Sequence, residues 1–222
     1  RKGRRGMKLA LFDCDGTLVD SAALIHEVMA RTFVDFGHPR PDISATKSII
    51  GLTLDIAIAR MQGKPHVDDE AVAMTAHYKK IYMDVRSEPG MDVPLFDGIK
   101  PVIAALAARD DILIGAVTGK SRRGLVNVLE THGFTPDFIV SRTADDCPSK
   151  PHPAMVTECC DETGMNPADA IVIGDAIYDM QMAKAAGAKA IGVSWGYASV
   201  EDLVAAGADA IVRHPKDLLE HF

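Results

Sequence analysis

Short apolar runs recur along this chain, and from residue 97 onward a segment with helical spacing separates each run from the next. Nearly continuous apolar runs rich in β-branched residues are typical of strands buried on both faces of a sheet. Such strands, alternating with helices, join into a parallel sheet through right-handed crossovers. We predict strands at residues 9–12, 112–117, 138–140, 170–173, 190–193 and 210–212. The expected fold class is α/β, with a doubly wound, Rossmann-like parallel sheet as its core.

The segments between these runs have the signals of helices. They are exemplified by residues 99–108, 124–131 and 178–186, and Gly133 and Gly187 follow the last two as C-terminal caps. The chain has 222 residues, of which 47% are hydrophobic and 25% charged, so it can build a sizeable core. This composition excludes a disordered or collagen-like chain.

Residues 21–86 contain no such buried run, and their apolar residues recur at helical spacing, as in Ile25, Met29 and Phe33. Ser21 is a candidate N-cap for the first helix, and the Pro- and Gly-containing stretch at 87–94 is a candidate return linker. We therefore predict an inserted α-helical cap domain. The expected division is an α/β core at residues 7–20 and 88–222, the cap at 21–87, and an extension of uncertain status at 1–6.

Charge and hydropathy limit the partners of the chain. Its net charge of −7 argues against nucleic acid, and no apolar stretch approaches the roughly 18 to 20 residues of a membrane span. The four cysteines show no C-x-x-C spacing, so we expect neither a disulfide framework nor a zinc site. We predict a cytoplasmic protein with no nucleic-acid or membrane partner, and the sequence sets no oligomeric state.

The strongest chemical signal is the run Asp13-Cys14-Asp15-Gly16-Thr17, which directly follows the first predicted strand. Side chains alternate along a strand, so Asp13 and Asp15 can share one side while Cys14 points to the other. Aspartates after a strand also form ordinary turns and caps, and this pair alone does not separate the two interpretations.

Three further polar signals follow later strands. They are Thr118-Gly119 before a helix, Lys150 ahead of two prolines, and Asp175 with Asp179 four residues on. Each alone is also compatible with a helix cap or a surface charge. However, the carboxyl ends of parallel strands gather at one edge of the sheet, where such folds bind ligands. Clustered carboxylates bind Mg²⁺, and a hydroxyl and an ammonium hold phosphate, so the set predicts a metal-dependent phosphate site.

On these motifs the sequence resembles the haloacid dehalogenase superfamily, specifically its phosphatases with a helical cap after the first motif. Residues 13–21, DCDGTLVDS, are similar to the first motif of the superfamily. Thr118 and Lys150 match the second and third motifs, and Gly174-Asp175-x-x-x-Asp179 matches the fourth. The resemblance spans residues 7–222.

The stretch GVSWGY at residues 192–197 is similar to phosphoglycolate phosphatase-like members of the superfamily. Two positions depart from the pattern, because Gly119 stands where Asn is frequent and Ala198 where Gly is frequent. These departures concern the substrate rather than the chemistry.

The resemblance implies a Mg²⁺-dependent phosphomonoesterase that hydrolyses a small phosphorylated metabolite, phosphoglycolate-like or a sugar phosphate, through an aspartyl-phosphate. It makes Asp13 the nucleophile and Asp15 the general acid and base. It also implies that Asp179 does not bind the metal itself but supports the residues around it. The phosphate-binding residues that it implies are Thr118, Gly119 and Lys150, and the Mg²⁺ ligands are Asp13, Asp175 and the backbone carbonyl of Asp15.

Other functions use similar residues. A phosphomutase, such as a β-phosphoglucomutase-like enzyme, shares the core set but does not release the phosphoryl group to water. A catalytically silent phosphate-binding protein is a further alternative, whereas a signalling receiver domain is about half this length. We expect the cap to set specificity, and for Arg122 and Arg123 we favour a solvated helix face. The cap candidates for substrate contact are residues 50–53, His26, Lys47 and Arg86.

Overall fold

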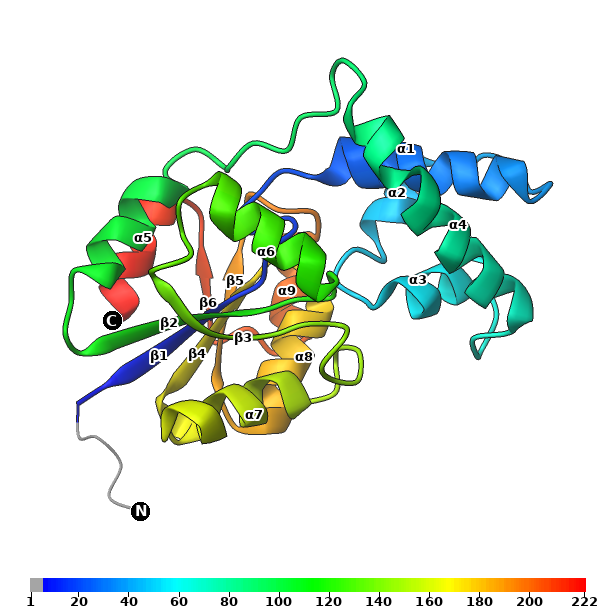
Figure 1. Ribbon diagram of the computed structural model, residues 1–222. Coiled ribbons are helices and arrows are strands. Elements are labelled where there is room, and N and C mark those ends of the chain that lie inside the picture. Colours follow the sequence, from blue (N-terminus) through cyan, green and yellow to red (C-terminus); the bar gives the residue numbers. More distant parts are fainter. Residues whose placement is uncertain (1–5) are drawn as a thin grey trace.

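The computed structural model describes residues 6–222 (Figure 1), so all of the predicted extension except Gly6 lies outside the described residues. Six parallel strands form one sheet in the order β3-β2-β1-β4-β5-β6. Every predicted strand is present, with ends that differ by two residues at most, and the α/β fold class is confirmed. The strands are β1 (Lys8–Phe12), β2 (Ile112–Val117), β3 (Phe138–Arg142), β4 (Ala170–Gly174), β5 (Lys189–Val193) and β6 (Ala210–Val212).

The order of the strands in the sheet indicates where a ligand would bind. The chain leaves β1 to form β2 and β3 on one side, then returns to form β4, β5 and β6 on the other. In a doubly wound sheet, loops diverge at this reversal and leave a crevice at the carboxyl ends of the central strands. The residues that follow β1, β2 and β4 therefore lie at the position where such folds bind ligands.

Helices cover both faces of the sheet and bury its alternating side chains. Ala10 and Phe12 belong to the hydrophobic cluster on one face, whereas Leu9 and Leu11 belong to the cluster on the other. The first face carries α5 (Ile99–Ala107), α6 (Arg122–Thr131) and the 3-10 helix Pro215–His221. The second face carries α7 (Ala154–Thr163), α8 (Ile177–Ala186) and α9 (Val200–Ala205), and a 3-10 turn at Pro167–Asp169 precedes β4.

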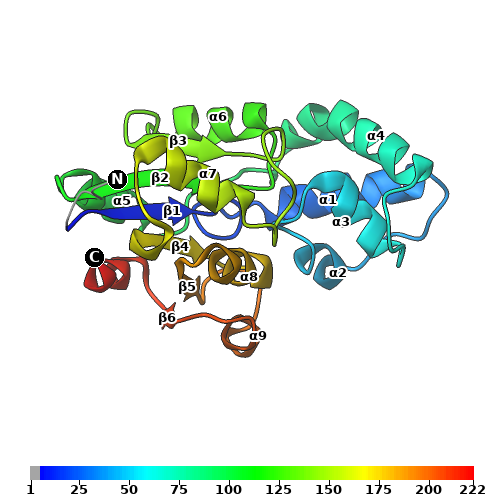
Figure 2. The same cartoon turned by 90° about the horizontal axis from the view of Figure 1, so that it is seen from below.

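A group of helices between β1 and α5 lies beyond the carboxyl ends of the strands (Figure 2). They form their own hydrophobic cluster, which also includes Ala176 and Tyr178 at the start of α8. The division into a core and a cap at residues 21–87 stays a prediction, and we call these four the cap helices. They are α1 (Ala22–Asp35), α2 (Ile43–Lys47), α3 (Leu54–Met61) and α4 (Asp69–Arg86).

The two segments that join the cap helices to the sheet run side by side. The Asp20 backbone N–H donates to the Pro94 carbonyl at 2.8 Å, and the Phe96 N–H donates to the Leu18 carbonyl at 3.0 Å. Ser21 precedes α1 as expected, but the predicted side-chain cap is wrong. Its hydroxyl instead donates to a carboxylate oxygen of Asp15 at 2.7 Å, so it is not available to the helix N-terminus.

The membrane prediction concerns helix length and hydropathy. Within residues 6–222, no helix combines the length and the apolar character needed to cross a bilayer.

Candidate active site

Asp13 lies immediately after β1 and is almost fully buried, with 1% of its surface exposed. Its backbone N–H donates to the Ile173 carbonyl at 2.9 Å, which fixes it against β4. Its Oδ1 accepts from the Cys14 N–H at 2.7 Å and lies 3.0 Å from the Lys150 ammonium. Its Oδ2 is buried and finds no hydrogen-bond partner within residues 6–222. One oxygen of this carboxylate is therefore held in place while the other is free to meet a ligand.

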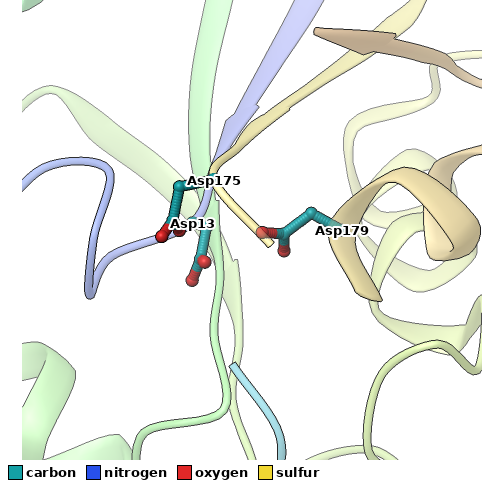
Figure 3. A group of neighbouring side chains, drawn as sticks. All are labelled: Asp13, Asp175 and Asp179. Carbon is teal, nitrogen blue, oxygen red and sulfur yellow. The ribbon is translucent and has the colours of Figure 1, made fainter. Parts of the chain in front are cut away.

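Asp13, Asp175 and Asp179 form a compact acidic cluster (Figure 3). One carboxylate oxygen from each lies within 4.8 Å of the others, and all three residues are buried. Burial and the neighbouring Asp179 charge raise the pKa of Asp175 to about 7, and the same two causes raise the pKa of Asp13 well above its ordinary value. Three buried carboxylates this close together repel one another, so their oxygens fit a hard divalent cation such as Mg²⁺.

Lys150 supplies a buried positive charge to this cluster. Its ammonium lies 2.7 Å from Asp179 Oδ1 and 3.0 Å from Asp13 Oδ1, and its side chain is fully buried. Asp179 Oδ2 accepts from the Ala176 N–H at 3.2 Å, so both oxygens of Asp179 have partners. These contacts hold the Asp179 carboxylate and the Lys150 ammonium against each other, and the supporting role of Asp179 stays a prediction.

Asp175 follows β4 and is held by groups from two other loops. Thr17 Oγ1 donates to its Oδ1 at 3.2 Å, and the Tyr197 N–H donates to its Oδ2 at 3.0 Å. Two glycines allow these loops to come so close. Gly16 has a φ of +84°, and a Cβ at Gly16 or Gly196 would overlap the Asp175 side chain.

Asp15 belongs to a different environment from the acidic cluster. Its Oδ1 accepts from the Ser21 hydroxyl at 2.7 Å, and the Lys120 ammonium lies 3.1 and 3.2 Å from its two oxygens. The two carboxylates of the first motif thus have separate cationic partners, Lys150 for Asp13 and Lys120 for Asp15. Sequence reasoning assigned no role to Lys120, although a cation directly after Thr118-Gly119 at a strand end was the available signal.

Thr118 and Gly119 follow β2 and complete the group of predicted phosphate-binding residues. Thr118 is buried, and its hydroxyl accepts from the Lys120 N–H at 3.1 Å. Gly119 packs against the backbone of the loop between α2 and α3. A Cβ atom added at position 119 would stand 2.6 Å from the Gly51 carbonyl oxygen. All the predicted site residues therefore lie at one edge of the sheet, Asp179 in the first turn of α8 and the others on loops.

Tyr197 connects this edge to the segments that lead into the cap, a function that sequence reasoning missed. Its hydroxyl donates to Asp20 Oδ1 at 2.8 Å and accepts from the N–H groups of Ser21 and Ala22, both at 3.0 Å. Its own N–H donates to Asp175. The resemblance of residues 192–197 to a known family was the only signal at this position.

The remaining candidates lie apart from this chemistry. The four cysteines are free and buried, and burial raises the pKa of the Cys14 thiol well above its ordinary value. Arg122 pairs with Asp146 at 2.5 Å, and Arg123 is exposed, as expected for a helix face.

The fold is that of an α/β protein whose candidate active site lies at the carboxyl ends of its parallel strands. The family model for haloacid dehalogenase-like hydrolases matches residues 10–193. The chain belongs to this family, and the predicted resemblance is confirmed.

The similar proteins agree with this assignment. A protein of Dickeya dadantii described as a probable phosphatase, IndB, is 31% identical and the match covers 92% of this chain and 88% of that protein. A phosphoglycolate phosphatase of Yersinia pestis is 30% identical, with 94% and 90% covered. A haloacid dehalogenase-like hydrolase structure from Streptococcus pneumoniae has a TM-score of 0.81 at 25% identity, with 98% and 99% covered. The prediction that the chain is a phosphatase is confirmed.

Proposed function

We propose that the chain is a Mg²⁺-dependent phosphomonoesterase that hydrolyses a small phosphorylated metabolite through an aspartyl-phosphate on Asp13. The observation that carries the proposal is the unpaired, buried Asp13 Oδ2 beside a fixed ammonium and two further carboxylates. A carboxylate held at one oxygen and free at the other is arranged to attack phosphorus.

In the first step, Asp13 Oδ2 attacks phosphorus while the bond to the leaving oxygen breaks. Asp15 gives a proton to the leaving alkoxide, which departs as an alcohol. In the second step, Asp15 takes a proton from a water molecule that attacks the same phosphorus. The aspartyl bond breaks, inorganic phosphate leaves, and Asp13 returns to a carboxylate. The separate surroundings of Asp13 and Asp15 support this division of roles.

The phosphoryl group carries negative charge, which fixed positive groups must stabilise. In this proposal Lys150, the Thr118 hydroxyl and the backbone N–H of Gly119 hold its oxygens. Mg²⁺, when bound by Asp13, Asp175 and the Asp15 carbonyl, supplies further charge neutralisation at the phosphoryl oxygens. Asp179 maintains the Lys150 ammonium in position through its 2.7 Å contact.

The proposed substrate is a phosphoglycolate-like ester or a sugar phosphate. The similarity to phosphoglycolate phosphatases supports the first, and the site residues themselves address only the phosphoryl group. A cytoplasmic location and the absence of nucleic-acid and membrane partners stay predictions.

A phosphate-release screen tests the proposal. The purified chain with Mg²⁺ is offered phosphoglycolate, sugar phosphates, nucleotides and an aryl phosphate, and Asp13→Asn serves as the control for contaminating phosphatases. We expect phosphate release from at least one small ester by the wild type only. Isomerisation of a sugar phosphate without net release would favour the mutase alternative, and binding without turnover would favour the silent phosphate-binding protein.

A further inference from the structure

The loop between α2 and α3 extends from the cap helices toward the core, beyond the carboxyl ends of the strands (Figure 1). We call residues 48–53 of this loop the docking segment. Its backbone makes the polar and steric contacts with the core that are described below, while its buried side chains Ile49, Ile50 and Leu52 share a hydrophobic cluster with Ala176 and Tyr178.

One contact is steric and depends on the glycine at position 119. A Cβ atom there would lie 2.6 Å from the Gly51 carbonyl oxygen and 2.8 Å from that of Leu52. Both are backbone atoms, and at such distances the docking segment would have to move. Gly119 has an ordinary backbone conformation, since its φ is not in the left-handed region, so space is the reason for glycine here.

Two hydrogen bonds hold the same segment at its ends. The Thr53 N–H donates to the Ser149 hydroxyl at 3.0 Å, and the Tyr178 hydroxyl donates to the Ser48 carbonyl at 2.7 Å. Tyr178 also belongs to the hydrophobic cluster of the cap helices, and the Arg60 guanidinium from α3 lies over its ring at 5.6 Å.

These three core residues are each next in sequence to a residue of the site. Gly119 follows Thr118, Ser149 precedes Lys150, and Tyr178 precedes Asp179. They come from three separate segments, the loops after β2 and β3 and the first turn of α8 after β4. The docking segment therefore lies across the loops that carry the proposed phosphate- and metal-binding groups.

We propose that Gly119, Ser149 and Tyr178 form the seat of the cap and that this seat makes the enzyme selective for short leaving groups. The inference rests on the proposed phosphatase function. With no side chain at position 119, the docking segment comes within backbone contact of the phosphate-binding turn. In this proposal a short ester is bound beneath the seated segment. A bulky leaving group keeps the segment away from its seat, so the closed segment no longer helps to bind and orient that ester.

Substitutions at the seat test the inference in the Mg²⁺-loaded enzyme. Gly119→Ala should lower kcat/KM for phosphoglycolate by about tenfold or more, mainly through KM, while kcat/KM for a bulky aryl phosphate changes less than about threefold. Ser149→Ala and Tyr178→Phe should also lower kcat/KM for phosphoglycolate relative to kcat/KM for the aryl phosphate, each by roughly two- to tenfold. Ser87→Ala is the matched control, because that hydroxyl donates only to Asp84 within the cap.

Hydrogen exchange provides a readout that does not depend on turnover. The Thr53 amide should exchange faster in Ser149→Ala than in the wild type, and Ser87→Ala should leave it unchanged. If Gly119→Ala fails to fold, the other two variants still decide the matter.

The outcomes separate the two proposals. Equal losses on short and bulky esters, or no loss on either, would overturn the seat while leaving the phosphatase intact. A wild-type enzyme that prefers bulky over short esters would also overturn it. Failure of the wild type to hydrolyse any ester would instead overturn the proposed function, whatever the exchange rates.

Discussion

The Lys120 ammonium contacts both carboxylate oxygens of Asp15, at 3.1 and 3.2 Å. The two residues are 105 positions apart and follow neighbouring strands, β2 and β1. Both side chains are nearly buried, at 13% and 11% exposure, so solvent screens the pair little. With the Ser21 hydroxyl, Lys120 fixes the orientation of the proposed general acid.

Replacing Lys120 should therefore damage acid catalysis more than nucleophilic attack. We expect Lys120→Met to lower kcat on an alkyl phosphate by about 10²-fold, because Asp15 loses its orientation. Hydrolysis of an activated aryl phosphate should fall much less, and Lys100→Met, at an exposed lysine of α5, is the control. Similar losses on both esters would show that Lys120 acts elsewhere in the reaction.

Asp15→Asn should show the same dependence on the leaving group in a stronger form. An amide cannot donate the proton that an alkoxide needs, so we expect a loss of about 10²- to 10⁴-fold on alkyl esters. An aryl phosphate, whose leaving group needs no proton, should be affected far less. Steady-state kcat on the two esters measures the difference, and equal losses would remove Asp15 from the acid role.

Asp13→Asn should reduce turnover by at least about 10³-fold on every ester, because an amide is a poor nucleophile toward phosphorus. Single-turnover experiments with labelled phosphate should find covalent label on the wild-type chain and none on the variant. A variant that retains a tenth of wild-type kcat would contradict the assignment of Asp13.

Asp179→Ala should destabilise the fold because it removes one of two carboxylates that neutralise the buried Lys150 ammonium. Losing a partner of a buried ion pair costs about 3 kcal/mol. Chemical denaturation measures the change, and Asp169→Ala, which removes a half-exposed partner of Lys8, should have little effect. If the two variants proved equally stable, Asp179 would have no function in holding Lys150.

The acidic cluster should make stability depend on pH and on Mg²⁺. The pKa of Asp175 is raised from 3.8 to about 7, so between these two values the folded chain binds more protons than the unfolded chain. Without metal, the melting temperature should fall as pH rises through about 7. Mg²⁺ competes with the proton, so its stabilising effect should be larger at about pH 8 than at about pH 6, and Asp175→Asn should remove this difference. A Mg²⁺ effect that does not vary with pH would contradict the role of Asp175.

Much of the fold could be predicted because its signals are local. The run at residues 170–173 is apolar throughout, as a strand buried on both faces requires, and β4 forms there. Strand ends were less certain. Ser141 and Arg142 are polar, so the pattern ended at residue 140, although backbone pairing with β2 continues through Arg142.

The chemical groups of the candidate site could be predicted from the order of the residues alone. Asp13, Thr118, Lys150 and Asp175 each follow a strand, and parallel topology gathers strand ends at one edge. Their grouping therefore required only the correct order of strands and helices.

Tertiary structure alone decided which of these groups meet. Lys120 pairs with Asp15, Ser21 donates to the same carboxylate instead of capping α1, and Gly119 lies under the carbonyl of Gly51. These contacts join residues from different parts of the chain, and each would be lost if the partners moved apart by a small distance. Periodicity and spacing report which face or end of an element a residue occupies, but not the packing between elements that fixes such distances.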